Sequence, residues 1–265
     1  MSNNNPIGIF DSGIGGLTVF KEVSNMLPNE DIIYLGDTAR VPYGIRSAET
    51  VARYSFECAD FLMNKLVKVL VVACNTVSAV SLPEIRDRVP IPVIGVIEPG
   101  ARAAVTATIN KRIGVIGTEA TIKSSAYFRA LKAIDTAVEV SGLACPLFVP
   151  LVEEGWTEGE ITKLVVEKYL TQLKDKDIDT IVLGCTHYPL LKGIIQEVMD
   201  GITIIDSAVE TGKSLKLVLS EGPLLKHSQE AGAHKFFVTD STEKFVAVGE
   251  RFLGREIKDI ERVRL

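Results

Sequence analysis

The sequence predicts an α/β protein of two pseudo-symmetric domains, each a mostly parallel sheet flanked by helices. Short apolar, β-branched runs alternate with amphipathic helical segments along the 265 residues, as in βαβ units. The pattern restarts half-way, because Ile113–Thr118 repeats the character of Ile7–Ser12. Two buried-strand patterns, at 69–73 and 180–184, each end directly before a cysteine. These three observations indicate two related units.

Composition narrows the class of protein. The apolar fraction of 46% supports a large core, and no apolar run approaches the ~20 residues of a membrane span. A net charge of −5, no basic run and one tryptophan argue against nucleic acid as a partner. The first residues do not resemble a signal peptide, so we expect a cytoplasmic protein with its four cysteines as thiols. No zinc-type spacing occurs, so no metal is expected.

The first half begins with a strand at Ile7–Phe10 and a glycine-rich turn at Asp11–Gly16. The next segment, 17–27, carries apolar residues at helical spacing and ends before Pro28. Ser47 is a suitable N-cap for a later helix. The remaining expected elements are a strand at 31–36, a loop at 37–44, a helix at 47–66, a strand at 69–73, a short helix near Pro83, and a strand at 92–97 closed by Glu98–Gly100.

The second half repeats the alternation, and the tail continues it. We expect helices at 101–109, 158–173, 209–219 and 242–252, and strands at 113–118, 136–140, 180–184, 202–206, 235–239 and 259–263. The tail is expected to pack on the first unit.

The spacing of the repeated features indicates a diverged duplication. Ile113 follows Ile7 by 106 positions, and Cys185 follows Cys74 by 111 positions. Two such units would face their strand ends across a cleft, and ligands of open α/β sheets bind at the carboxyl ends of strands. We therefore predict an active site in that cleft. The expected first domain comprises 1–98 and 208–265, and the second comprises 99–207.

Cys74 and Cys185 are the main candidates for chemistry. Each follows an apolar strand and precedes two side chains suited to ligand binding, Asn75-Thr76 in one case and Thr186-His187 in the other. A lone cysteine is more often a core residue, which is how we interpret Cys58 and Cys145. Core packing does not explain two cysteines placed alike at two strand ends.

The turn Asp11–Gly16 resembles a phosphate loop but lacks its Lys-Ser/Thr ending, and an acid there would repel phosphate. Backbone amides facing a small carboxylate fit better, with a plain tight turn as the alternative.

His187 can exchange a proton with Cys185, and Asp11 can do so with Cys74. His227 and His234 are interpreted as exposed tail residues. Asp37 and Glu153 are candidate outer-shell acids or ordinary surface carboxylates.

The motifs together resemble the glutamate racemases, cofactor-independent enzymes of the aspartate/glutamate racemase superfamily. The resemblance runs from about Ile7 to the end of the second domain and continues more weakly through the tail. The segments that carry it are Asp11–Gly16, Asp37, Val41–Gly44, Ala73–Thr76, Pro92–Gly100, Gly117–Thr121 and Gly184–Pro189. Both cysteine motifs in this order make a specific signal, and His187 favours glutamate among the acids used by relatives.

The resemblance implies a set of roles. Catalytic or supporting residues would be Cys74, Cys185, Asp11, His187, Asp37 and Glu153. Substrate contacts would come from Asp11, Ser12, Tyr43, Gly44, Asn75, Thr76, Thr118, Thr121, Thr186 and His187. It implies that Cys74 acts on the D-isomer and Cys185 on the L-isomer, with no cofactor and no metal. It also implies a homodimer whose product, D-glutamate, supplies peptidoglycan synthesis.

The chemistry explains why two thiols are needed. Racemisation removes the α-proton from one face of the substrate and returns a proton to the other, so two groups of the same kind on opposite walls serve it. Two other functions remain open from the residues alone. A cysteine hydrolase would use one thiol with His187 but leaves the second cysteine unexplained. A non-catalytic amino-acid-binding protein would explain the cleft but not the thiols.

Overall fold

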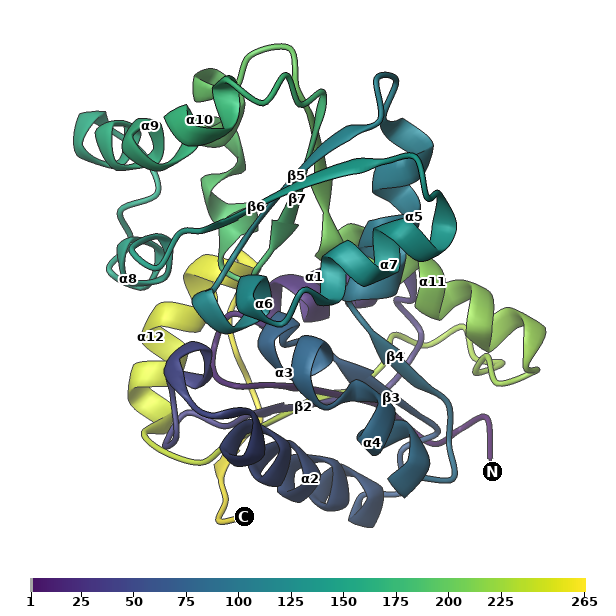
Figure 1. Ribbon diagram of the computed structural model, residues 1–265. Coiled ribbons are helices and arrows are strands. Elements are labelled where there is room, and N and C mark those ends of the chain that lie inside the picture. The colour runs from purple at the N-terminus through teal and green to yellow at the C-terminus, as the bar shows by residue number, and fades with distance from the viewer. Residues whose placement is uncertain (1) are drawn as a thin grey trace.

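The strands form two separate parallel sheets in the computed structural model, which describes residues 2–265 (Figure 1). The first sheet has the strand order β10-β9-β2-β1-β3-β4, and the second has the order β6-β5-β7-β8. The strands are β1 (Ile7–Asp11), β2 (Ile32–Gly36), β3 (Val69–Val72), β4 (Val93–Gly95), β5 (Arg112–Gly117), β6 (Glu139–Ala144), β7 (Thr180–Gly184), β8 (Thr203–Asp206), β9 (His234–Val238) and β10 (Ile260–Arg262).

The two sheets repeat one topology. The order β2-β1-β3-β4 in the first sheet matches β6-β5-β7-β8 in the second. In the first, Ile7 pairs with Ile32 and Val69; in the second, Ile113 of the central strand pairs with Val140 and Thr180. The strands β3 and β7, which precede the two cysteines, therefore occupy equivalent places. This confirms the predicted fold class of two similar parallel α/β units.

Helices cover both faces of each sheet (Figure 1). They are α1 (Leu17–Met26), α2 (Ala48–Asn64), α3 (Asn75–Val80), α4 (Leu82–Arg88), α5 (Ile97–Ala107), α6 (Glu119–Lys123), α7 (Ala126–Ile134), α8 (Phe148–Glu153), α9 (Glu160–Lys174), α10 (Lys192–Val198), α11 (Ser207–Glu221) and α12 (Thr242–Leu253), with short 3-10 turns η1 (Tyr43–Ile45) and η2 (Tyr188–Leu191). The helix α11 packs against both α1 and α5, which joins the two halves. Within residues 2–265, no helix combines the length and apolarity needed to cross a membrane.

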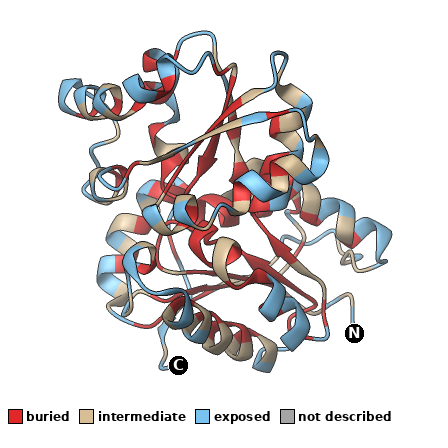
Figure 2. Ribbon diagram, viewed as in Figure 1, coloured by how far each residue is buried: buried red, intermediate tan, exposed pale blue. Residues whose placement is uncertain are grey.

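Burial follows the predicted strand patterns (Figure 2). The strands β1, β3 and β7 are buried along their whole length, as continuous apolar runs between two helical layers require. The edge strands β6 and β10 are largely intermediate or exposed. The central strands thus provide rigid supports whose carboxyl ends carry the candidate site.

Two predicted elements are wrong in position. The strand expected at 92–97 ends at Gly95, and α5 already begins at Ile97, so Glu98–Gly100 lie in its first turn instead of closing a strand. Pro99 is tolerated there because first-turn amides need no helical partner. The strand expected at 136–140 is β6, three residues further on, because an edge strand lacks a continuous apolar run that would mark its ends.

The tail extends the first sheet, because β9 pairs with β2 and β10 pairs with β9. His234 is not the exposed tail residue that we expected. It begins β9, is half-buried, and its ring lies edge-on to Phe20 at 5.1 Å between centroids. The helices α3, α6, α7, α8 and α10 were not predicted. All but α7 have five to seven residues, which is too few to show a helical period in the sequence.

Candidate active site

A small cavity of about 60 Å³ lies where the carboxyl ends of β1, β3 and β7 meet. Residues from both halves of the chain line it: Ser12, Val41, Pro42, Tyr43, Gly44, Cys74, Asn75, Thr76, Thr118, Val149, Cys185, Thr186 and His187. Ligand sites are more often ~300–1,000 Å³, so this one suits a small molecule. Both strand-end cysteines therefore border a single cavity, as the duplicated pattern predicts.

Cys74 caps the start of α3, and its sulfur lies 3.5 Å from the hydroxyl oxygen of Ser12. Burial, together with the nearby carboxylate of Asp11, raises the pKa of the Cys74 thiol to about 12. Asp11 is completely buried, and its Oδ2 accepts a hydrogen bond of 2.9 Å from the amide of Gly13. Burial also raises the pKa of Asp11. This wall of the cavity thus favours the protonated thiol.

The surroundings of Cys185 are built on a histidine. The Sγ of Cys185 lies 3.9 Å from His187 Nδ1, while His187 Nε2 lies 2.9 Å from Glu153 Oε1. Burial alone would lower the pKa of His187, but hydrogen bonds to Cys185 and Glu153 raise it to about 10. The same ion pair lowers the pKa of Glu153. His187 is therefore an imidazolium at neutral pH, with one N–H directed to Glu153 and the other side facing the sulfur.

The glycine-rich turn after β1 allows the two halves to approach closely. A Cβ at Gly15 would lie 2.3 Å from Thr186 Oγ1 and 2.4 Å from His187 Nδ1. Thr18, at the start of α1, donates a hydrogen bond of 2.9 Å to the carbonyl of Thr186. Gly15 therefore leaves the space that Thr186 and His187 occupy.

Three threonine hydroxyls connect the halves at the other end of the cavity. Thr76 Oγ1 lies 3.0 Å from Thr118 Oγ1 and 3.5 Å from Thr121 Oγ1, and Thr118 caps α6. A Cβ on Gly44 would lie 3.0 Å from the Cβ of Thr118, so the Tyr43-Gly44 turn rests directly on the second half. These contacts bring together residues that the sequence analysis had listed separately.

Asp37 is buried behind the cavity and does not line it. Its carboxylate accepts hydrogen bonds from Tyr43, from Arg40 at 2.6 Å and from Thr239 at 2.9 Å. The arrangement fixes Tyr43, which does line the cavity. Asp37 is thus a supporting acid and not a surface carboxylate.

Four predicted site residues lie one layer away from the cavity: Asp11, Asp37, Thr121 and Glu153. Each contacts or neighbours a lining residue, as described above. The sequence analysis missed the apolar lining by Val149 and the contact of Tyr127 with Asn75, whose Oδ1 accepts a 2.7 Å hydrogen bond from the phenol hydroxyl. An isolated valine or tyrosine gives no signal of such a role in the sequence.

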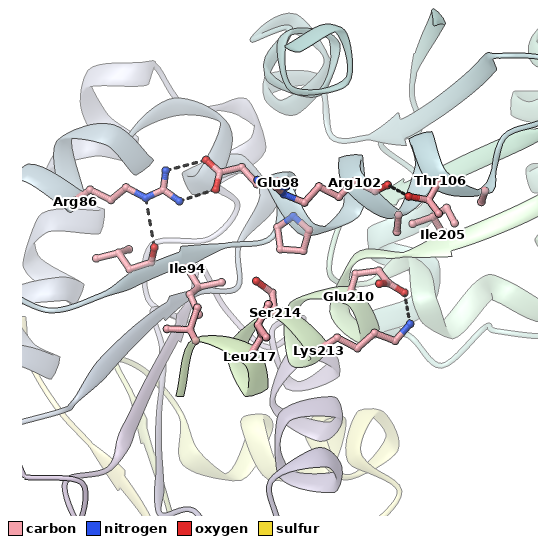
Figure 3. Close-up of a pocket in the computed structure, with 15 residues that line it drawn as sticks. Arg86, Ile94, Glu98, Arg102, Thr106, Ile205, Glu210, Lys213, Ser214 and Leu217 are labelled. Carbon is pink, nitrogen blue, oxygen red and sulfur yellow. Dashed lines mark hydrogen bonds and ion pairs between the residues drawn. The ribbon is translucent and has the colours of Figure 1, made fainter. Parts of the chain in front are cut away.

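A larger cavity of about 870 Å³ lies between α4, β4, α5, β8 and α11 (Figure 3). Four of its charged groups form two pairs, the bidentate contacts of 2.8 Å between Arg86 and Glu98 and the 2.8 Å pair of Glu210 and Lys213. None of the described residues lining it is a cysteine or histidine. Among residues 2–265, no three histidine, cysteine or acidic side chains gather to hold a metal ion. The smaller cavity is therefore the candidate active site.

The chain is similar to proteins of known function along nearly its whole length. The family model for Asp/Glu/hydantoin racemases matches residues 7–212. A glutamate racemase of Geobacter metallireducens is 54% identical over 98% of this chain and 96% of its own. The chain belongs to the glutamate racemase family. Among solved members of the family, the Francisella tularensis enzyme in complex with D-glutamate has a TM-score of 0.94 at 42% identity, covering 99% of this chain and 98% of its own.

A glutamate racemase isoform of Bacillus anthracis gives a TM-score of 0.95 at 44% identity, with 98% of both chains covered. Family membership therefore extends over both sheets and the tail, and not only over the cysteine motifs.

Proposed function

We propose that the protein interconverts L- and D-glutamate with two cysteines and no cofactor. The observation that carries the proposal is that Cys74 and Cys185, from separate halves of the chain, line one small cavity. The relatives named above supply the substrate, since one was solved with D-glutamate. Neither a hydrolase nor a binding protein accounts for the second cysteine.

The reaction then proceeds by proton exchange across the cavity. One sulfur, as a thiolate, takes the α-proton, so that a C–H bond breaks and an S–H bond forms. The other sulfur, as a thiol, gives its proton to the opposite face, which restores the C–H bond with inverted configuration. We propose that Cys74 acts on the D-isomer and Cys185 on the L-isomer. Asp11 and His187 support the two sulfurs in these roles.

The substrate carboxylates need donors because the carbanion intermediate is high in energy. We propose that these come from Ser12, the Tyr43-Gly44 turn, Asn75, Thr76, Thr118, Thr121, Thr186 and His187. Asn75 supports this assignment most directly, because its Nδ2 is buried and has no hydrogen-bond partner within the described part of the chain. A buried amide donor without a partner is costly unless a ligand satisfies it.

Three further parts of the proposal concern the whole protein. We propose that residues 1–98 and 208–265 form one domain and residues 99–207 the other, in agreement with the membership of the two sheets. We propose a homodimer, as the resemblance to the family implies. The free thiols of all four cysteines are compatible with a cytoplasmic enzyme that supplies D-glutamate for peptidoglycan.

The decisive experiment follows the optical rotation of L-glutamate mixed with purified protein. We expect the rotation to decay to zero, at a rate that EDTA and hydroxylamine leave unchanged. In heavy water, one solvent deuterium should be incorporated at the α-carbon. Loss of activity restored by a metal or by pyridoxal phosphate would contradict the cofactor-free mechanism. A trapped acyl-enzyme would favour the hydrolase, and glutamate binding without deuterium exchange would favour the binding protein.

A further inference from the structure

Tyr127 lies at the junction of the two halves, although it does not line the active-site cavity. It is 3% exposed and lies in α7 of the second half. A Cβ on Gly184 would lie 3.0 Å from its ring, and a Cβ on Gly100 would lie 3.6 Å from its hydroxyl oxygen. The ring thus packs against the residue before Cys185 and against α5, which leads from one sheet to the other.

The hydroxyl of Tyr127 reaches across to the first half. It donates a hydrogen bond of 2.7 Å to Oδ1 of Asn75, the residue after Cys74. Burial raises the pKa of Tyr127, so the phenol keeps its proton and remains a donor at neutral pH. Because the carbonyl oxygen of the Asn75 amide is held in this way, its Nδ2 is the end left without a partner.

We propose that Tyr127 is a positioning residue that orients the Asn75 amide, so that Nδ2 donates to a substrate carboxylate. The inference rests on the proposed function, because it names the group that aims a substrate contact of that site. This hydrogen bond joins the residue after Cys74 to a helix of the second half that packs against Gly184, the residue before Cys185. It therefore forms only when the two halves are placed as they are in the assembled site.

The variant Tyr127→Phe tests this role, since it removes one hydroxyl and leaves the ring packed against Gly184. We expect kcat/KM to fall about tenfold for both isomers, because the donor that holds the substrate carboxylate and stabilises the carbanion is no longer fixed in direction. In Asn75→Ala the amide is absent, so adding Tyr127→Phe should lower kcat/KM no further. If the two effects multiply, Tyr127 acts independently of Asn75 and the proposal is wrong.

A matched control separates positioning from loss of stability. Tyr188 is also fully buried, and its hydroxyl donates to the carbonyls of Gly117 and Cys145 at 3.0 and 2.8 Å. Tyr188→Phe should lower the melting temperature comparably, but its effect on kcat/KM should multiply with that of Asn75→Ala. Non-additivity with Tyr188→Phe as well would indicate a general loss of structure and overturn the specific role of Tyr127.

The side-chain amide of Asn75 provides a readout in the ligand-free protein. In ¹⁵N-labelled wild type we expect two Hδ2 resonances that exchange slowly with solvent. In Tyr127→Phe we expect their chemical shifts to change and their exchange with solvent to become faster, because the amide can then turn about the Cβ–Cγ bond. Unchanged resonances would overturn the inference. If wild type fails to racemise glutamate, the proposed function fails, while this measurement still decides whether Tyr127 holds Asn75.

Discussion

The two cysteines differ in what surrounds them, although they follow equivalent strands. Cys74 lies beside the hydroxyl of Ser12 and near the buried acid Asp11, and its thiol pKa is raised to about 12. Cys185 faces the protonated ring of His187. A site that must work in both directions therefore rests on two chemically different walls.

We predict that Cys74→Ser and Cys185→Ser each lower racemisation by at least about a thousandfold, because a hydroxyl is a far weaker base than a thiolate at neutral pH. Deuterium wash-in from each isomer measures the effect. Cys145→Ala, which removes a buried thiol off the cavity, serves as the control and should stay within a few-fold of wild type. The opposed-thiol mechanism would be refuted if either serine variant racemised near the wild-type rate. It would also be refuted if both cysteines exchanged the α-proton of the same isomer only.

The ion pair of His187 and Glu153 predicts a pH dependence. Because the pKa of His187 is raised from 6.5 to about 10, its contribution to stability is complete below pH 6.5 and is lost as the pH rises through about 10. Because the pKa of Glu153 is lowered from 4.5, its contribution is present above that value and is lost as the pH falls through the lower folded pKa. The pair therefore stabilises the fold most between these limits.

We expect Glu153→Gln to lower the pKa of His187, since it removes the charge that holds the ring proton. An NMR titration of the His187 ring measures the change, and Glu154→Gln, one residue along and exposed, is the control. The kcat of the L-to-D direction should fall more than that of the D-to-L direction. The KM values must change to compensate, because the equilibrium constant fixes the ratio of kcat/KM in the two directions. An unchanged His187 pKa in Glu153→Gln would disprove the assigned role of this pair.

At the scale of elements, the turn between β1 and α1 determines how closely the halves approach. One of its glycines makes room for the second half of the chain, because the atoms that a Cβ on Gly15 would meet belong to Thr186 and His187. Sequence reasoning assigned these glycines to a ligand cradle. The structure gives Gly15 a second purpose, which is to leave room for His187.

We predict that Gly15→Ala destabilises the protein by about 1–3 kcal/mol, as overpacking does, and lowers racemisation at least tenfold by displacing His187. Gly193→Ala is the matched control, because Gly193 lies in α10 with no atom within 4 Å of the added Cβ. It should raise stability by about 0.5–1 kcal/mol and leave activity unchanged. Thermal unfolding measures the change in stability, and polarimetry measures the change in racemisation. Equal effects of the two variants would contradict the steric argument.

At the scale of the whole molecule, one buried ion pair connects distant segments of the first sheet. Lys68 and Glu30 have side chains 0% and 3% exposed, and Lys68 also donates to the carbonyl of Asn3 at 2.6 Å. Glu30 further accepts a 2.8 Å hydrogen bond from the amide of Lys226 in the tail. The pair therefore joins the N-terminus, the start of β3 and the tail.

We predict that Glu30→Ala lowers the free energy of unfolding by about 3–5 kcal/mol, because it leaves the Lys68 charge buried without its partner. Asp60→Ala breaks the pair of Asp60 with Arg88, both about half exposed, and should have little or no effect. Urea denaturation of both variants measures the difference. Equal midpoints would mean that the buried pair does not hold these segments together.

The sequence by itself determined the fold class, the strands that carry the site and the two cysteines. It could do so because a buried parallel strand requires a continuous apolar run. Such a run occurs in both halves of the sequence, and a cysteine follows each one. The misplaced elements are those without such a pattern. The edge strand β6 is only partly buried, so it lacks a continuous apolar run. The helix α5 begins inside the segment 92–97 that was predicted as a strand, because a first helical turn tolerates Pro99.

Only the tertiary structure decided which side chains support the cysteines. Glu153 meets His187 across 34 positions, and Tyr127 meets Asn75 across 52. Neither contact has a local spacing that could reveal it, because each depends on how helices from different units pack around the cavity. Burial then sets the chemistry, since the pKa values of Cys74, Asp11 and His187 follow from loss of solvent and from those distant partners.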